Sequence, residues 1–136
     1  RFDALFWVDL PSEADRAEIL RIHLSKNNQM SEEVESSMGR LCEVTRGFSG
    51  AEIESTVHAA MFKAFNDDSE RVTPTHLEDA ALTITPIAKL RREDIEISRM
   101  WAKERCQFAQ DAELVNLESL HQDRVRMIQS RSINLN

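Results

Sequence analysis

The stretch 45–53, with the sequence TRGFSGAEI, constrains the fold of this chain more than any other. Gly47 can end a helix in the left-handed conformation that other residues resist. Ser49 can cap the helix that follows, and Glu52, three residues further on, completes a capping box. Phe48 before the cap and an isoleucine after Glu52 occupy the two positions of a hydrophobic staple. The stretch therefore predicts a tight helix-to-helix corner, where backbone N–H groups and a helix dipole are accessible to a ligand.

Length and composition indicate one helical domain, or one such domain with an appendage. The chain has 136 residues, of which 41% are hydrophobic, and this is enough for a modest core. Three Gly, three Pro and no Tyr favour helix over sheet. The net charge of −7 disfavours a nucleic-acid backbone as the main partner.

The cysteines indicate the cellular compartment, and the first residue indicates how the chain relates to a longer protein. Cys42 and Cys106 lie far apart within helical patterns, which favours two reduced, buried thiols in a cytoplasmic protein. No apolar run is long enough to span a membrane, and no signal peptide is visible. The chain begins with Arg1 rather than Met, which predicts a fragment of a longer protein.

Hydrophobic periodicity predicts a mostly α fold: a bundle of four helices, one short strand before it and a C-terminal helical extension after it. The strand is expected within residues 2–10, with its sheet partners missing from this chain. The helices of the bundle are expected over residues 12–26, 31–47, 49–65 and 73–85, and two further helical segments over 91–111 and 114–129. Two caps compete at the start of the fourth helix: Thr73 before Pro74, or Thr75 with Glu78.

No catalytic constellation is visible within the chain. A Walker A loop needs a glycine before Lys-Ser/Thr, and none of Gly39, Gly47 and Gly50 precedes a lysine. No His-Glu-x-x-His or Cys-x-x-Cys motif is present, so no metal site is specified. The four histidines are scattered, and a lone histidine on a helix is more often structural or solvated than catalytic: His23, His58, His76 and His121.

Three segments in order resemble a known family: Arg-Phe-Asp at 1–3, Asp-Leu-Pro at 9–11 running on to His-Leu at 23–24, and Gly-Phe-Ser-Gly-Ala-Glu-Ile at 47–53. Together they resemble the C-terminal part of an AAA ATPase module. In that family an Arg-Phe-Asp stretch closes the large nucleotide-binding domain, and a last strand ending in proline leads into a four-helix lid. The match is densest over residues 1–85 and is most similar to the AAA proteins encoded in plastid and cyanobacterial genomes and their bacterial relatives.

The resemblance implies a division into three parts. Residues 1–11 would be the last strand of a large AAA domain that is missing from the chain, and residues 12–90 the lid. Residues 91–136 would be the C-terminal extension and tail. The resemblance does not explain residues 112–136, and whether they pack back, dock on a neighbour or stay mobile is left open.

The resemblance also implies a nucleotide site. Arg1 would be the arginine finger that reaches the nucleotide of a neighbouring subunit. Ile19 and His23, one helical turn apart, would border the adenine and ribose, as would the small residues Gly50 and Ala51. Without the resemblance, Arg1 is a stray terminal residue, Ile19 and His23 are core or rim residues, and Gly50 and Ala51 begin an ordinary capped helix.

Two classes of function follow. In the first, the chain is the lid of an ATP hydrolase that works as a homo-oligomeric ring, expected to be a hexamer, with ATP and Mg held at the missing large domain. The lid covers the nucleotide, and the chain alone is expected to be inactive and to bind ATP only weakly. In the second, it is a free-standing helical interaction module that uses residues 114–128. A cytoplasmic location is expected, or the plastid stroma if the gene is plastid-encoded, and the protein substrate is not specified.

Overall fold

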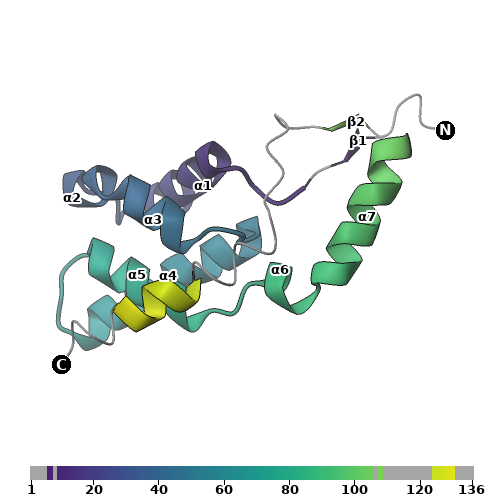
Figure 1. The fold of residues 1–136 in the computed structure, drawn as a ribbon. Helices are drawn as coiled ribbons and strands as arrows, with labels where there is room; N and C mark the ends of the chain where they lie inside the picture. The colour runs from purple at the N-terminus through teal and green to yellow at the C-terminus, as the bar shows by residue number, and fades with distance from the viewer. Residues whose placement is uncertain (1–5, 8, 106, 109–123, 131–136) are drawn as a thin grey trace.

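Five helices pack together at one end of the molecule, and two further helices project from them (Figure 1). The computed structural model describes residues 6–7, 9–105, 107–108 and 124–130. The first five helices are α1 (Glu13–Lys26), α2 (Glu32–Ser36), α3 (Met38–Val44), α4 (Gly50–Asn66) and α5 (Pro74–Thr83). The remaining elements are α6 (Ile87–Leu90), α7 (Arg92–Arg105), the two-residue strands β1 (Phe6–Trp7) and β2 (Gln107–Phe108), and a helical segment over 124–130.

One apolar core joins α1 to α5. The pattern that predicted the helices also supplies their buried faces, because positions three and four apart lie on one side of a helix. Leu20 and Leu24 of α1 meet Ile53 and Val57 of α4 there, and all four are at most 1% exposed. The prediction of a mostly α-helical fold is confirmed at this level.

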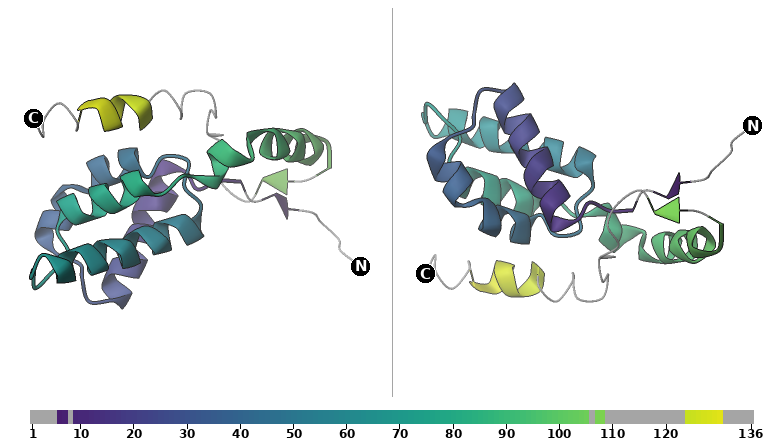
Figure 2. Two further views of the ribbon diagram at one scale, coloured as in Figure 1. Left: turned by 90° about the horizontal axis from the view of Figure 1, so that it is seen from below. Right: turned by 90° about the horizontal axis from the view of Figure 1, so that it is seen from above.

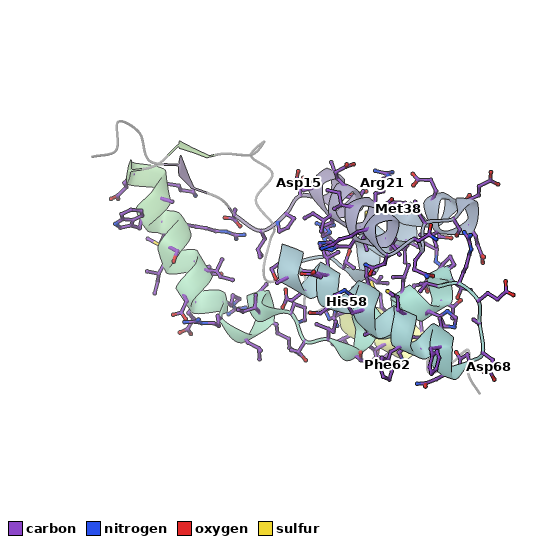
Figure 3. The ribbon with its side chains drawn as sticks, turned by 180° about the vertical axis from the view of Figure 1, so that it is seen from behind. Asp15, Arg21, Met38, His58, Phe62 and Asp68 are labelled. Carbon is purple, nitrogen blue, oxygen red and sulfur yellow. The ribbon has the colours of Figure 1, made fainter. Side chains whose placement is uncertain are left out.

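Side-chain caps begin four of these helices, α1, α2, α4 and α5. Ser12 and Asp15 form a capping box at α1, and Asp15 is labelled in Figure 3 at the start of that helix. At α5, Thr73 is the cap, with Pro74 in the first turn and the His76 ring accepting a hydrogen bond from the Thr73 N–H at 3.1 Å. The alternative box of Thr75 and Glu78 does not form, because the Glu78 carboxylate is buried and pairs with Arg40 at 2.9 Å.

The prediction of one helix over residues 31–47, and with it the count of four helices, is wrong. Ser37 separates α2 from α3, with backbone angles of −97° and 5°, and its N–H donates to the carbonyls of both Glu33 and Val34. The hydroxyl of Ser36 bonds back to the Glu32 carbonyl at 2.8 Å. Serine side chains compete for backbone groups in this way, so two in a row favour a break.

The strand prediction needs a second correction. Within the described residues, β1 is two residues long, and it pairs in parallel with β2, so that Phe6 lies opposite Gln107 and Trp7 opposite Phe108. The strand therefore has a partner within this chain, although its partners were expected to be missing. Nothing in the periodicity of residues 2–10 could show this, since the pairing joins Phe6 to Gln107, far apart in the sequence.

The C-terminal extension also differs from the prediction. The expected helix over 91–111 is shorter, because α7 begins at Arg92 and ends at Arg105, before β2, and the short helix α6 precedes it where no helix was predicted. The segment 124–130, which overlaps the helix predicted over 114–129, lies alongside the bundle (Figure 2). Within the part of the chain that the structure describes, no helix combines the length and apolar character that a membrane span needs.

Candidate functional site

The corner between α3 and α4 forms as its sequence predicts. Gly47 has a φ of 79°, in the left-handed region. Ser49 caps α4: its hydroxyl accepts a hydrogen bond from the Glu52 N–H at 3.3 Å, and its own N–H donates to Glu52 Oε2 at 2.7 Å. Phe48 and Ile53 are fully buried, as members of a hydrophobic staple should be. The corner is therefore a rigid junction that holds the first turn of α4.

The first turn of α4 lies against the middle of α1. A Cβ atom placed on Gly50 would lie 3.9 Å from Ile19 Cδ1, which is ordinary van der Waals contact. Ile19 and Gly50 are both half-buried, and Ala51 is exposed. The structure thus brings the predicted residues Ile19 and Gly50 together, with Ala51 beside them on the solvent side.

His23 takes part in a second contact between the same two helices, one turn further along each. Its Nδ1 lies 3.8 Å from Glu54 Oε1, and its side chain is 20% exposed. Because Gly50 and Glu54 are four residues apart, as are Ile19 and His23, the two contacts share one face of the helix pair. Four of the five predicted site residues therefore lie on this face or at its edge. Arg1 lies outside the described residues.

A groove of about 530 Å³ opens on another side of Gly50. It lies between the linker that precedes α1, the start of α4, and the helices α6 and α7. Its lining includes Leu10, Pro11, Ser49, Gly50, Ile87 and Ile95. Gly50 is the member of the predicted set that lines it. The sequence could not predict this groove, since helices from the extension form one wall.

Arg124 touches the corner from the C-terminal segment, and sequence reasoning missed it. Its guanidinium donates to the Ile84 carbonyl at 2.7 Å and to the Ala81 carbonyl at 3.3 Å, and its Cζ lies 5.3 Å from the centre of the Phe48 ring. Burial lowers the pKa of Arg124, and the negative charge of Glu52 opposes that shift. The C-terminal segment therefore packs back onto the bundle.

Two further buried arginines tie chain segments together. Arg99 of α7 forms a two-pronged ion pair with Asp9, with Nε and one terminal nitrogen each 2.7 Å from a carboxylate oxygen. Arg16 of α1 donates to the carbonyls of Pro11 and Cys42, each at 3.1 Å, and burial lowers its pKa. In the sequence, each of these arginines is simply a charged residue within an amphipathic helix. That pattern does not predict which residue the arginine contacts.

The described residues offer no other chemistry that the sequence analysis raised. No group of three or more His, Cys, Asp or Glu among them is placed to hold a metal ion. His76 completes a helix cap and lies 3.1 Å from Asp67, whereas His58 is exposed along α4 (Figure 3). Burial raises the pKa of the Cys42 thiol, which makes it a poor nucleophile at neutral pH.

Comparison with known proteins identifies the class to which this fold and corner belong. Residues 36–79 match the family model of the AAA+ lid domain, a span that includes the whole corner. The chain thus carries a lid domain of the AAA family, which confirms the resemblance drawn from the sequence.

Particular relatives agree with this assignment. The chain is 35% identical over 105 residues to the uncharacterized AAA domain-containing protein ycf46 of Pyropia yezoensis, an alignment that covers 75% of this chain and 20% of that protein. It is 34% identical over 104 residues to the ATP-dependent zinc metalloprotease FtsH of Aster yellows witches'-broom phytoplasma, covering 75% of this chain and 15% of that protein. This chain spans about a fifth or less of the length of these relatives.

A solved structure shows the same fold. The crystal structure of the FIGL-1 AAA domain in complex with ADP superposes with a TM-score of 0.61 at 20% sequence identity, covering 71% of this chain and 36% of that chain. At this identity the likeness speaks for the fold, and the roles of Arg1, Ile19, His23, Gly50 and Ala51 stay predictions.

Proposed function

We propose that this chain is the lid of an AAA ATPase, and that it covers a nucleotide held between itself, a large domain outside this chain and a neighbouring subunit. The observation that carries the proposal is the shared face of α1 and α4, where Ile19 meets Gly50 and His23 lies one turn away. The AAA family assignment supports the proposal. A second support is that the predicted residues come from two helices and still lie on one face.

The chemistry of this face suits the base and sugar of ATP. Ile19 supplies apolar surface for a purine ring, and His23 can donate or accept one hydrogen bond to the ribose or base. Gly50 has no side chain to hold the ligand away from the backbone. A site of this kind is mostly apolar with few polar groups, as small-molecule sites usually are.

The same corner is poorly suited to phosphate. A free helix N-terminus attracts anions, but the Glu52 carboxylate already accepts from the Ser49 N–H and places negative charge on the first turn of α4. A phosphate there would face like charge. The proposal therefore assigns ATP phosphates and Mg to the large domain, with Arg1 of one subunit reaching the phosphates bound by its neighbour in a hexameric ring.

A matched pair of glycine substitutions tests the nucleotide face. We expect Gly50→Ala to fold normally, because its Cβ would meet Ile19 at 3.9 Å, and to weaken ATP binding because the methyl group occupies the ligand's approach. Gly39→Ala in α3 is the control, since a Cβ there meets nothing within 4 Å. Titration of a fluorescent ATP analogue into a polypeptide that carries this lid behind its large domain measures both. Equal affinity for the two variants would contradict the proposed face.

The isolated chain provides a second test. The 136-residue chain is expected neither to hydrolyse ATP nor to bind it tightly, because the phosphate-binding groups lie elsewhere. Measurable turnover by the purified chain would overturn that expectation. In the assembled ring, Arg1→Ala is expected to preserve nucleotide binding and reduce turnover; unchanged turnover would remove Arg1 from the role of finger.

One observation favours the second candidate, a helical interaction module that binds no nucleotide. Phe62 and Phe65 are 72% and 78% exposed near the end of α4, and Phe62 is labelled on the outer side of that helix in Figure 3. A free-standing module would also need a sheet partner for its strand, and β2 supplies one within this chain. A Walker A motif and an acidic Walker B strand encoded upstream of Arg1 would decide for the ATPase, and their absence for the module. The proposed location for either is the cytoplasm, or the plastid stroma if the gene is plastid-encoded.

A further inference from the structure

The β1–α1 linker, residues 9–11, is held from the side by α7. Both oxygens of the Asp9 carboxylate lie 2.7 Å from nitrogens of Arg99, and the side chains are only 2% and 10% exposed. A two-pronged pair of this kind fixes the angle between its partners as well as their distance. The linker therefore has one fixed orientation relative to α7.

The start of α6 is held by the corner. The Ile87 N–H donates to Glu52 Oε1 at 2.5 Å, while the other oxygen of the same carboxylate accepts from Ser49 at 2.7 Å. One carboxylate thus connects the cap of α4 to the first residue of α6. The Ser12–Asp15 box of α1 shows that a cap needs no such extra contact.

A small apolar cluster fills the space between these two contacts. Ala88 of α6 is 1% exposed and packs with Leu10 of the linker and Ile95 of α7. This cluster is separate from the main core of the lid. The extension therefore contacts the linker at Arg99 and again at Ala88, and it contacts the corner at Ile87.

We infer that α6 and α7 form a brace that couples the β1–α1 linker to the nucleotide-facing corner, with Arg99 and Glu52 as its two positioning residues. When the linker turns, the brace carries the first turn of α4 with it, so Gly50 keeps its place relative to the linker. The coupling itself depends only on these contacts. Its consequence for ATP rests on the proposed function.

Hydrogen exchange in the 136-residue chain, resolved by peptide, tests the coupling. Arg99→Gln is expected to speed exchange in α7 and also in residues 50–53 and 87–90 by about tenfold or more, since exchange follows the local opening equilibrium. The α4–α5 core should stay protected, which shows that the variant folds. Arg91→Gln is the matched control, because Arg91 pairs with Asp94 on the exposed surface of the same extension. Faster exchange confined to α7 and the linker would overturn the brace.

Coupling must be reciprocal, so the opposite end supplies a second measurement. Glu52→Gln is expected to speed exchange in α7 as well as in the first turn of α4. Asp15→Asn, in the capping box of α1, should affect α1 alone. If Glu52→Gln left hydrogen exchange in α7 unchanged, the contact with Ile87 would be only a local cap, and the brace would be refuted.

Measurements of ATP binding distinguish a failure of this inference from a failure of the proposed function, on which part of the inference rests. In a polypeptide with its large domain, Arg99→Gln is expected to weaken binding of the ATP analogue several-fold, and Arg91→Gln to leave it unchanged. If the wild type bound no ATP while the exchange results held, the proposed function would fail and the brace would stand. If Gly50→Ala weakened binding but Arg99→Gln did not, the lid function would stand and the role of the brace in binding would be refuted.

Discussion

The bundle α1–α5 and the C-terminal extension are held by different kinds of contact. Side chains from all parts of the bundle share one apolar core, in which Leu24, Ile53 and Val57 are fully buried. The extension attaches instead through one small apolar cluster around Ala88 and through single polar contacts made by Arg99, by Arg124 and by the Glu52 carboxylate. Apolar burial is spread over many residues and has no direction, whereas each polar contact depends on one pair of atoms. The bundle should therefore tolerate single changes at its surface, and the extension should be sensitive to the loss of a single contact.

The largest expected effect is a cavity in the bundle. Phe48→Ala empties a fully buried site and should lower the free energy of unfolding by about 3 to 5 kcal/mol. Phe62→Ala, at a position 72% exposed, is the control and should change it by about 0.5 kcal/mol or less. Urea unfolding followed by circular dichroism measures both. Similar losses for the two variants would show that the buried corner does not carry the stability of the bundle.

The next effect concerns the contact that holds the C-terminal segment. Arg124→Met removes the hydrogen bonds to Ala81 and Ile84 but keeps an apolar stem over Phe48, and should cost about 1 to 3 kcal/mol. The loss should appear as faster hydrogen exchange in residues 124–130, with the bundle still protected. Arg126→Met, on the exposed side of the same segment, should leave exchange unchanged. Global unfolding of the first variant would mean that the segment belongs to the core.

A smaller effect distinguishes the capping boxes of α1 and α4. Glu52→Gln should cost about 1 kcal/mol, because it weakens both the cap of α4 and the contact to Ile87 and removes charge from the helix N-terminus. Asp15→Asn weakens a cap alone and should cost about half as much. Thermal unfolding of the two variants side by side tests this ranking, which an equal loss would contradict.

The smallest effect comes from an exposed ion pair within the bundle. Arg21 of α1, labelled in Figure 3, donates to Glu35 at 2.6 Å, and this hydrogen bond holds the pKa of Glu35 below its ordinary value. A carboxyl whose pKa is lower in the folded state stabilises the fold above its unfolded pKa, and the benefit disappears as the pH falls through the folded value. Acid should therefore remove a small part of the stability of the wild type below about pH 4.5.

Two variants isolate that contribution. In Glu35→Gln, the midpoint temperature of unfolding should fall slightly less at acid pH than it does in the wild type. Salt should reduce this difference between the two proteins, because both side chains of the pair are exposed. Glu33→Gln on the same helix is the control. A larger acid effect from Glu33→Gln than from Glu35→Gln would contradict the assignment to this pair.

The bundle could be predicted from sequence because its signals are local. Caps at Ser12, Ser31, Ser49 and Thr73 and apolar positions at helical spacing placed the helices. The break at Ser37 was missed because periodicity continues across it, from Val34 to Met38 and Leu41. Adjacent serines were the signal that could have been used.

The candidate site was predictable only through resemblance to a family. Ile19 and His23 share a helix face, but nothing local in the sequence indicates that Gly50 packs against that face. The groove beside Gly50 was not predictable, since Ile87 and Ile95 reach it from the extension. Long-range pairs such as Asp9 and Arg99, 90 positions apart, leave no periodic trace because each involves a single residue.

The corner between α3 and α4 shows which features the sequence determines and which the tertiary structure determines. The sequence by itself determined that Gly47 ends one helix, that Ser49 and Glu52 begin the next, and that Phe48 is buried between them, because all these interactions act within four residues. Only the tertiary structure decided that the second oxygen of Glu52 receives the Ile87 N–H and that Arg124 covers Phe48. Those contacts join distant segments, and their geometry exists only once the bundle has packed.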